Sequence, residues 1–487
     1  MVAKIEERPR LFIGGEFVEG SGGRFETINP ATGEKLAEVP LGTGEDVDAA
    51  VQAAKRAFRE WWERSPVERG RCLRQLAGRL RERAREYAWL DAVDGGNPFK
   101  SMLFDVELAA QTLEYFAGLA TEVKGETIPT VAGVLNLTQR EPYGVVGRII
   151  PFNHPILFAA SRIAAPLAAG NTVVLKPAEQ TPLSALELAK DIAEIFPPGV
   201  VNIVTGDGPT TGAALVAHPE VRRIAFTGSV ETGRMIMRAA AEQLKVLSLE
   251  LGGKNPIIIF PDADVEAATE AVVIGMNFMW CQGQSCGSTS RLFVHESVYD
   301  QVVEQVAERA RRIVIGLPTE EAAEMGCLVS EEQFQKVMSY IELGKREGFR
   351  LVLGGGKPQG KAFERGYFVA PTIFADVDPR SRLAQEEIFG PVLSAIKWSR
   401  YEEMVEAVNS VPYGLTASIW TRNFAQAYQT AREVQAGYVW INESSRHYLG
   451  VPFGGYKHSG LGREESLDEL LGYTQIKSIN INTSKGW

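Results

Sequence analysis

The residues best suited to chemistry in this sequence surround Cys286, in the run Gly283-Gln284-Ser285-Cys286-Gly287-Ser288. A thiolate is a strong nucleophile, and the flanking Gly and Ser residues leave room for a substrate to reach it. The alternative is a buried cysteine that packs as a small hydrophobic residue, which is the commoner role of this residue type. The run by itself leaves both interpretations open.

A second candidate is Glu250, which stands between Leu249 and Leu251 at the end of an apolar run. Burying a carboxylate in such surroundings is unfavourable unless the group is paired or protonated. We therefore interpret Glu250 as a functional residue.

Alternating apolar runs and helical stretches must position these two residues. Helices are expected over 45–64 and 65–93, the second opened by a capping box from Ser65 to Glu68, and a further helix over 264–279 leads to Cys286. The alternation after Gly144 is typical of an α/β fold with parallel sheets covered on both faces. The expected strands are 145–150, 172–175, 200–204, 223–226 and 246–249 in a first series and 257–260, 292–295, 416–420 and 438–442 in a second.

Two glycine-containing loops follow strands of the first series. The loop 206–212 resembles a dinucleotide-binding fingerprint but has one residue too many before its last glycine. In the loop 226–233, Gly228 and Ser229 would let a pyrophosphate approach the N-terminus of the following helix. A tight turn without a ligand is the alternative for each loop.

The composition excludes several classes of function. The chain has 487 residues, of which 45% are hydrophobic and 23% charged, as expected for a globular protein of two or three domains. A net charge of −10 argues against a nucleic acid partner, and no apolar run reaches the ~18 residues of a membrane span. Four cysteines and a charged N-terminus without a signal sequence predict a cytoplasmic protein. Five histidines without metal-ligand spacing predict no metal site.

Seven segments follow one another along the chain: Pro151-Phe152-Asn153, Lys176 to Pro182, Phe226 to Ser229, Leu249 to Lys254, Gly283 to Cys286, Glu386 to Val392 and Pro452 to Lys457. Together they resemble the aldehyde dehydrogenase superfamily. The resemblance implies an α/β subunit with a Rossmann-like NAD-binding domain over 1–125 and 144–252 and an α/β catalytic domain over 253–450. A small β bridging region over 126–143 and 472–487 would join subunits into a homo-oligomer, a dimer or tetramer.

The resemblance also implies a role for individual residues. Cys286 would attack the aldehyde, Asn153 would stabilise the resulting oxyanion, and Glu250 would be the general base that activates water. NAD is the implied cofactor, with Lys176 and Glu179 on the adenosine ribose. The other implied cofactor-binding residues are Pro151, Phe152, Gly228, Ser229, Gly252, Glu387 and Phe389, and the implied substrate tunnel residues are His154, Trp280, His447 and Phe453.

The implied reaction is NAD-dependent oxidation of an aldehyde to a carboxylic acid through a cysteine thioester. The aromatic residues of the tunnel favour an uncharged aliphatic or aromatic aldehyde, although the same rings could form a cage for the ammonium group of a betaine or amino aldehyde. A coenzyme-A-acylating relative is less favoured, because such relatives generally lack the base that Glu250 provides. A catalytically silent structural relative is disfavoured by the intact Cys286, Glu250 and Asn153.

Overall fold

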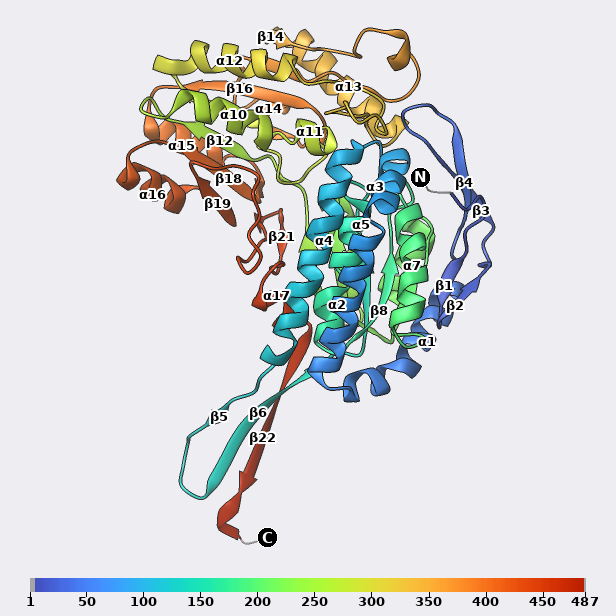
Figure 1. Cartoon of the computed structure of the whole chain (residues 1–487). Helices are drawn as coiled ribbons and strands as arrows, with labels where there is room; N and C mark the ends of the chain where they lie inside the picture. The colour runs from blue at the N-terminus through green and yellow to red at the C-terminus, as the bar shows by residue number, and fades with distance from the viewer. Residues whose placement is uncertain (1–4, 486–487) are drawn as a thin grey trace.

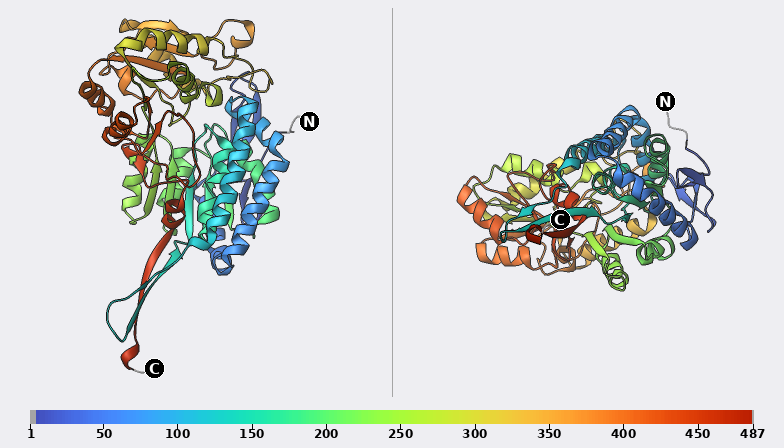
Figure 2. Two further views of the ribbon diagram at one scale, coloured as in Figure 1. Left: turned by 60° about the vertical axis from the view of Figure 1, so that its left-hand side comes forward. Right: turned by 90° about the horizontal axis from the view of Figure 1, so that it is seen from below.

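In the computed structural model, which describes residues 5–485, the chain forms two lobes and a long projecting pair of strands (Figure 1). Each lobe is built on a sheet with helices packed against it, and the projecting strands leave the lower end of the molecule in both side views (Figures 1 and 2). The first four residues of the predicted range 1–125 and the last two of 472–487 lie outside the described part. Within residues 5–485, no helix has the length and apolar character needed to cross a bilayer.

The first sheet has eight strands in the order β2-β1-β9-β8-β7-β10-β11-β21. The five strands from β9 to β11 are parallel, whereas β1 and β21 join the edges in antiparallel fashion. The strands are β1 (Leu11–Ile13), β2 (Glu16–Val18), β7 (Val145–Ile149), β8 (Thr172–Lys176), β9 (Val201–Ile203), β10 (Val221–Thr227), β11 (Val246–Glu250) and β21 (Gly460–Leu461).

The second sheet has seven strands in the order β14-β15-β16-β13-β12-β18-β19, parallel except for the edge pair β14–β15. The predicted α/β fold with two parallel series of strands is therefore confirmed. The strands are β12 (Pro256–Ile259), β13 (Arg291–His295), β14 (Arg350–Leu353), β15 (Thr372–Ala375), β16 (Val392–Trp398), β18 (Thr416–Trp420) and β19 (Tyr438–Ile441).

The helices before the first parallel strand differ from expectation at one place. Helix α1 (Gly44–Glu63) is present, and the capping box of Ser65 and Glu68 opens α2 (Pro66–Glu82) as predicted. The single helix expected over 65–93 is wrong, because the chain leaves helical geometry at Arg83 and α3 (Ala84–Gly95) begins at the next residue. The Arg83 guanidinium binds Glu187 and Asp191 of α7 (Leu183–Ile195), a tertiary contact that the periodicity of α2 does not contain.

The helix expected over 264–279 is also interrupted. Helix α10 (Val265–Gly275) ends before Asn277, which has a left-handed backbone with φ 54°, and the short helix α11 (Phe278–Cys281) follows. Asparagine tolerates this conformation better than most residues. Its side chain bonds Ser288 and Ser445, so contacts distant in sequence favour the break. The break turns Trp280 and the loop of Cys286 away from the line of α10.

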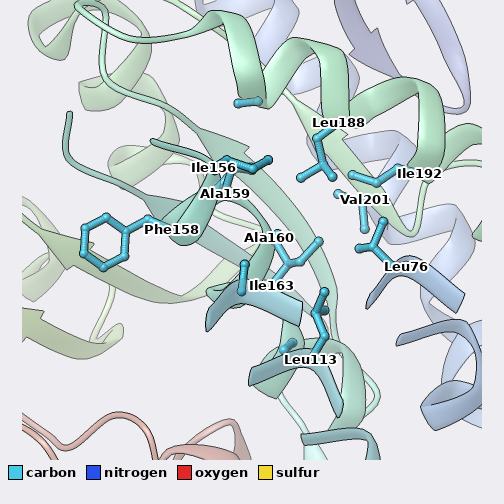
Figure 3. Packing of buried hydrophobic residues seen from close by; sticks show 14 of the residues in the cluster. Leu76, Leu113, Ile156, Phe158, Ala159, Ala160, Ile163, Leu188, Ile192 and Val201 are labelled. Carbon is cyan, nitrogen blue, oxygen red and sulfur yellow. The ribbon is translucent and has the colours of Figure 1, made fainter. Parts of the chain in front are cut away.

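The core of the first lobe lies between its sheet and the helices α2, α4 (Phe99–Leu119), α5 (Pro155–Ser161) and α7. Figure 3 shows Ile156, Ala160 and Ile163 near Leu113 of α4 and Leu188 of α7, whereas the ring of Phe158, at the border of the same cluster, points away from the other labelled residues. Helix α5 thus anchors in the core through Ile156 and Ala160 and carries the Phe158 ring toward His154. The other helices of this lobe are α6 (Ala164–Ala168), α8 (Ala213–Ala217) and α9 (Val230–Ala241).

The projecting sheet contains the two chain segments that the sequence assigns to a bridging region. Strand β22 (Thr474–Asn482) pairs with β6 (Val134–Pro142) along its whole length, and β5 (Thr127–Ile128) joins the other edge of β6. Four apolar side chains of this sheet and its turn are exposed: Ile128, Val131, Leu135 and Ile476. The second lobe also contains α12 (Tyr299–Arg311), α13 (Glu331–Arg346), α14 (Arg382–Gln385), α15 (Tyr401–Asn409) and α16 (Phe424–Glu433), and α17 (Leu467–Gly472) precedes β22.

Candidate active site

The loop of Cys286, between α11 and β13, is held by the side chain of one buried residue. Asn255, which precedes β12, donates from Nδ2 to the carbonyl oxygens of Cys286 (2.7 Å) and Ser288 (2.9 Å). Its Oδ1 accepts from the backbone N–H of Thr416 (3.0 Å) at the start of β18. Because β12 and β18 are neighbouring parallel strands, Asn255 fixes the thiol loop to the amino ends of two strands of the second sheet.

The environment of the Cys286 thiol disfavours the thiolate in the absence of a ligand. Burial, with smaller contributions from Glu387 and Glu250 and an opposing one from Arg162, raises the pKa of Cys286 to about 12. The loss of the thiol proton must therefore accompany attack on a substrate. Within residues 5–485, the backbone N–H of Cys286 donates to no other group, so it remains available to a ligand.

Glu250 ends β11 at the edge where the chain passes from the first sheet to the second. The residue is 4% exposed, and neither carboxylate oxygen has a hydrogen-bond partner among the described residues. Burial raises the pKa of Glu250 well above the usual range, and the nearby carboxylate of Glu464 raises it further. Gly454 lies close beside it, since a Cβ there would stand 2.9 Å from Glu250 Oε1. These surroundings suit a group that accepts a proton near neutral pH.

A buried ion cluster lies behind Glu250. Arg148 of β7 donates to Glu464 Oε1 (2.6 Å), and Arg162 pairs with the other oxygen of Glu464 (3.1 Å) and with Glu465 (3.6 Å). These arginines lower the pKa of Glu464, which remains charged. Because Glu464 and Glu465 follow β21, the cluster attaches the late segment of the chain to the first lobe.

Asn153 lies in the turn between β7 and α5 and reaches the thiol loop directly. Its Nδ2 donates to the carbonyl oxygen of Gln284 (2.8 Å), two residues before Cys286, and its backbone carbonyl accepts from Asn97 (2.8 Å). An amide nitrogen has two N–H groups, so one remains for a substrate oxygen. The structure thus brings Asn153 and the loop of Cys286 together.

The predicted ribose-binding pair Lys176 and Glu179 lies where β8 ends. Lys176 is 3% exposed, and its Nζ donates to the carbonyl of Pro177 (3.1 Å) and lies 3.6 Å from Glu179 Oε2. Burial lowers the pKa of Lys176. Its ammonium retains unused donors, and the carboxylate of Glu179 is partly exposed, so the pair offers a donor and an acceptor for a ribose diol.

The second predicted ribose-binding group, Glu387, fits against the glycines that end the first lobe. The N–H of Gly253 donates to Glu387 Oε1 (2.8 Å), and a Cβ on Gly252 would stand 2.2 Å from Oε2, so only glycine allows this approach. Burial raises the pKa of Glu387. Phe389 has a left-handed backbone (φ 59°), and its ring lies edge-to-face on Phe152, with centroids 5.7 Å apart.

The remaining predicted cofactor residues form two turns at carboxyl ends of strands. Ser229 caps α9 by accepting from the N–H of Thr232 (3.1 Å), and Gly228 precedes it where a Cβ would collide with the ring of Phe226. Pro151 lies in the turn after β7, beside Phe152 and Asn153. Both turns lie at the edge of the sheet where an open parallel α/β fold binds nucleotides. The residues present therefore fit a dinucleotide.

The four predicted tunnel residues fall into two aromatic groups. Phe453 and His447 (centroids 4.6 Å apart) belong to a cluster with Tyr438 and Trp440, against which Cys286 packs. His154 and Trp280 (4.9 Å) form the second group, around Asp105 of α4.

The sequence analysis missed several residues that shape the site. Asn255 and Gln333, which donates to the carbonyl of Phe389 (2.6 Å), hold the two functional loops. Tyr438 and Trp440 stand two residues apart, on one face of a predicted strand, and this spacing could have identified them. Asp105 could have been identified as an acid on the apolar face of a helix. Within the described residues, no three His, Cys, Asp or Glu side chains gather in a way that would hold a metal ion.

Comparisons with known proteins agree with this geometry. The model of the aldehyde dehydrogenase family matches residues 17–479. The chain is 48% identical over 466 residues to aldehyde dehydrogenase tropH of Talaromyces stipitatus, covering 94% of this chain and 90% of that protein. It is 45% identical to retinaldehyde dehydrogenase 3 of Mus musculus, covering 97% and 92%. An NAD+ complex of an aldehyde dehydrogenase from Bacillus cereus superposes with a TM-score of 0.95 at 44% identity, covering 98% and 97%.

The fold is that of an α/β oxidoreductase. The chain belongs to the aldehyde dehydrogenase family. The family assignment made from the sequence is confirmed.

Proposed function

We propose that this protein oxidises an aldehyde to a carboxylic acid with NAD as the oxidant, and that Cys286 is the nucleophile. The observation that carries the proposal is the convergence on one loop of a thiol, an amide donor and two buried carboxylates. Asn153 binds the loop directly, and Glu250 and Glu387 both act on the pKa of Cys286.

The first step is attack of Cys286 Sγ on the aldehyde carbon. A carbon–sulfur bond forms, the thiol proton leaves, and the carbonyl oxygen becomes an alkoxide. The thiol proton passes to solvent water, so Glu250 keeps its capacity to accept a proton for the second step. The free N–H of Cys286 and the second N–H of Asn153 stabilise the alkoxide, as an oxyanion hole does.

The second step releases the acid. NAD, when bound, accepts the hydride that leaves the former aldehyde carbon, and a thioester to Cys286 remains. Glu250 takes a proton from a water molecule, which attacks the thioester, and the carbon–sulfur bond breaks. The carboxylate leaves and the thiol is restored. Because Glu250 provides this base, water is favoured over coenzyme A as the acceptor of the acyl group. The same base argues against a catalytically silent chain.

The cofactor is held by residues of both lobes. Lys176 and Glu179 bind the adenosine ribose, Gly228 and Ser229 allow the pyrophosphate to approach α9, and Glu387 binds the nicotinamide ribose. Glu179 would repel a phosphate on the ribose 2′ oxygen, so we propose NAD rather than NADP. The ranges 1–125 with 144–252 and 253–450 are then the cofactor-binding and catalytic domains.

The substrate is an uncharged aliphatic or aromatic aldehyde. The supporting feature is the apolar, aromatic cluster of Tyr438, Trp440 and Phe453 against Cys286. Relatives are named for retinaldehyde, hydroxyisobutyraldehyde and betaine aldehyde, so their names do not choose among substrates. Betaine or amino aldehydes remain the second candidate, because aromatic rings also bind ammonium groups.

The four thiols are free, as in a protein kept in the reducing cytoplasm.

The experiment that tests the proposed function compares Cys286→Ala with Cys281→Ala, whose thiol lies five residues away and is buried in packing. NADH formation from hexanal and benzaldehyde should disappear in Cys286→Ala and persist in Cys281→Ala. Both variants should retain NAD binding, measured as a rise in melting temperature with added NAD. Turnover by Cys286→Ala at the wild-type rate would refute the assignment of the nucleophile.

A further inference from the structure

One buried carboxylate holds two of the predicted substrate-binding residues. Asp105 Oδ2 lies 2.8 Å from His154 Nδ1, and Asp105 Oδ1 accepts from Trp280 Nε1 at 2.7 Å. Asp105 is fully buried on α4. The orientation of both rings is therefore fixed before any substrate arrives, as a site built for recognition requires.

The hydrogen bond to Asp105 determines which nitrogen of His154 carries the proton. A carboxylate only accepts, so neutral His154 holds its proton on Nδ1 and presents Nε2 as an acceptor. Among residues 5–485, no group donates to Nε2, and the side chain is 7% exposed. Nε2 is not one of the fully buried atoms that lack a partner, so a ligand can reach it and donate a hydrogen bond in place of water.

The position of His154 connects this nitrogen to the reacting centre. The residue follows Asn153, which binds the thiol loop, and its ring lies edge-on to Trp280 of α11, the helix that leads into the same loop. The two nitrogens lie on different sides of an imidazole ring. Because Nδ1 bonds Asp105 of α4, Nε2 faces away from α4.

We propose that His154 Nε2 accepts a hydrogen bond from the substrate, and that the preferred substrates are aldehydes that carry a hydroxyl group. The inference rests on the proposed oxidation at Cys286 and specifies its substrate class. A primary ammonium group would also donate, but burying its charge needs a free carboxylate, and both oxygens of Asp105 are already bonded.

The test compares kcat/KM within two matched pairs of substrates. The pairs are 3-hydroxybenzaldehyde with 3-methoxybenzaldehyde and 4-(hydroxymethyl)benzaldehyde with 4-ethylbenzaldehyde, and benzaldehyde is the reference. In each pair only the first member donates a hydrogen bond, and two pairs sample two distances from the carbonyl. Wild type should prefer the donor in at least one pair by roughly five- to tenfold.

Substitutions locate the effect. His154→Phe should abolish the preference, and a retained rise in its melting temperature with NAD shows that the variant is folded. Asp105→Asn should also abolish it, because an amide N–H donates to Nδ1 and moves the histidine proton to Nε2, making that nitrogen a donor. His218→Phe is the matched control: His218 is bonded to Asp48 (3.0 Å) at the opposite end of the first sheet, and its loss should leave the preference unchanged.

The outcomes separate this inference from the proposed function. If wild type oxidises no aldehyde with NAD, the proposed function fails. If it oxidises benzaldehyde but shows no preference in either pair, or if the preference survives in His154→Phe and disappears in His447→Phe, only the role of His154 is overturned.

Discussion

At the scale of single residues, the site depends on carboxyl groups kept in an unusual state. Glu250 is buried without a hydrogen-bond partner and lies near a second, charged carboxylate, Glu464, whose own charge is balanced by Arg148 and Arg162. Because both arginines pair with Glu464, Glu250 has no paired cation among the described residues to stabilise its charged form. It therefore keeps its affinity for a proton. A test of this role needs a variant that changes the protonation of residue 250 and keeps its shape.

Glu250→Gln preserves that shape and removes the ability to accept a proton. If hydride transfer can proceed without the base but hydrolysis needs it, the variant should stall at the thioester. Rapid mixing with saturating NAD and benzaldehyde should then release about one equivalent of NADH per site and little more in the steady state. Asn202→Ala, which removes a buried amide elsewhere in the first lobe, should turn over without a burst. Normal steady-state turnover by Glu250→Gln would contradict the role of the base.

The raised pKa of Glu250 also predicts how stability depends on pH. Between the usual carboxyl pKa of 4.5 and its raised value, the folded protein holds a proton that the unfolded chain has lost. Folding stability due to this group therefore falls as the pH rises through that range. Relative to wild type, Glu250→Gln should gain melting temperature on going from pH 5 to pH 8, as followed by thermal denaturation. An unchanged difference across this range would contradict the buried, unpaired state of the carboxyl group.

At the scale of elements, the site is a set of loops whose positions are fixed by polar side chains at strand ends. Asn255 connects the loop of Cys286 to β18, and Gln333 of α13 holds the turn of Glu387 and Phe389. Side-chain to backbone bonds of this kind determine the geometry of segments that have no regular structure of their own. Their loss should change the active site more than the fold.

Asn255→Ala removes three hydrogen bonds and leaves buried carbonyl groups unpaired, so it should reduce the free energy of unfolding by roughly 2–4 kcal/mol. It should also lower kcat strongly, since the thiol loop loses its anchor. Asn202→Ala is the control, because Asn202 makes similar bonds to Gly14, Val173 and Gly199 in the first lobe. Both variants should lose stability, measured by urea denaturation, but only Asn255→Ala should lose kcat. Equal kcat values in the two variants would show that Asn255 is merely structural.

The elements themselves were largely predictable from the sequence, because parallel strands buried on both faces read as apolar runs with turns between them. The two errors occurred where distant contacts override local periodicity: Arg83 reaches α7, and Asn277 binds Ser288 and Ser445. The same limit applies to the site. Glu250 could be identified from the sequence because a carboxylate is unusual among its apolar sequence neighbours. Asn255 could not, because its role depends on β18, which is close in space but distant in sequence.

At the scale of the whole molecule, the projecting sheet of β5, β6 and β22 extends away from both lobes (Figure 1). Its apolar side chains, including Ile476 at 60% exposure, are unfavourable in water, and its edges are open for pairing. We therefore expect a homo-oligomer, a dimer or tetramer, in which a second copy covers this sheet.

Removal of residues 474–487 should convert the oligomer to monomers, as measured by light scattering coupled to gel filtration. Ile476→Lys should weaken assembly in the same direction by placing a charge in the covered face, and Lys477→Ala, on the same strand, serves as its control. A wild type that is monomeric at micromolar concentration would contradict the prediction.

Strand β21 has a consequence for synthesis on the ribosome. Residues 460–461 complete the edge of the first sheet beside β11, whose last residue is Glu250. Ribosomes add roughly 5–20 residues per second, so the roughly 200 residues between these strands take on the order of 10–40 s to appear. Throughout that interval the nascent first lobe has an open strand edge that ends at Glu250, the proposed base. The order of translation thus leaves the proposed active site as one of the last parts of the subunit to be closed.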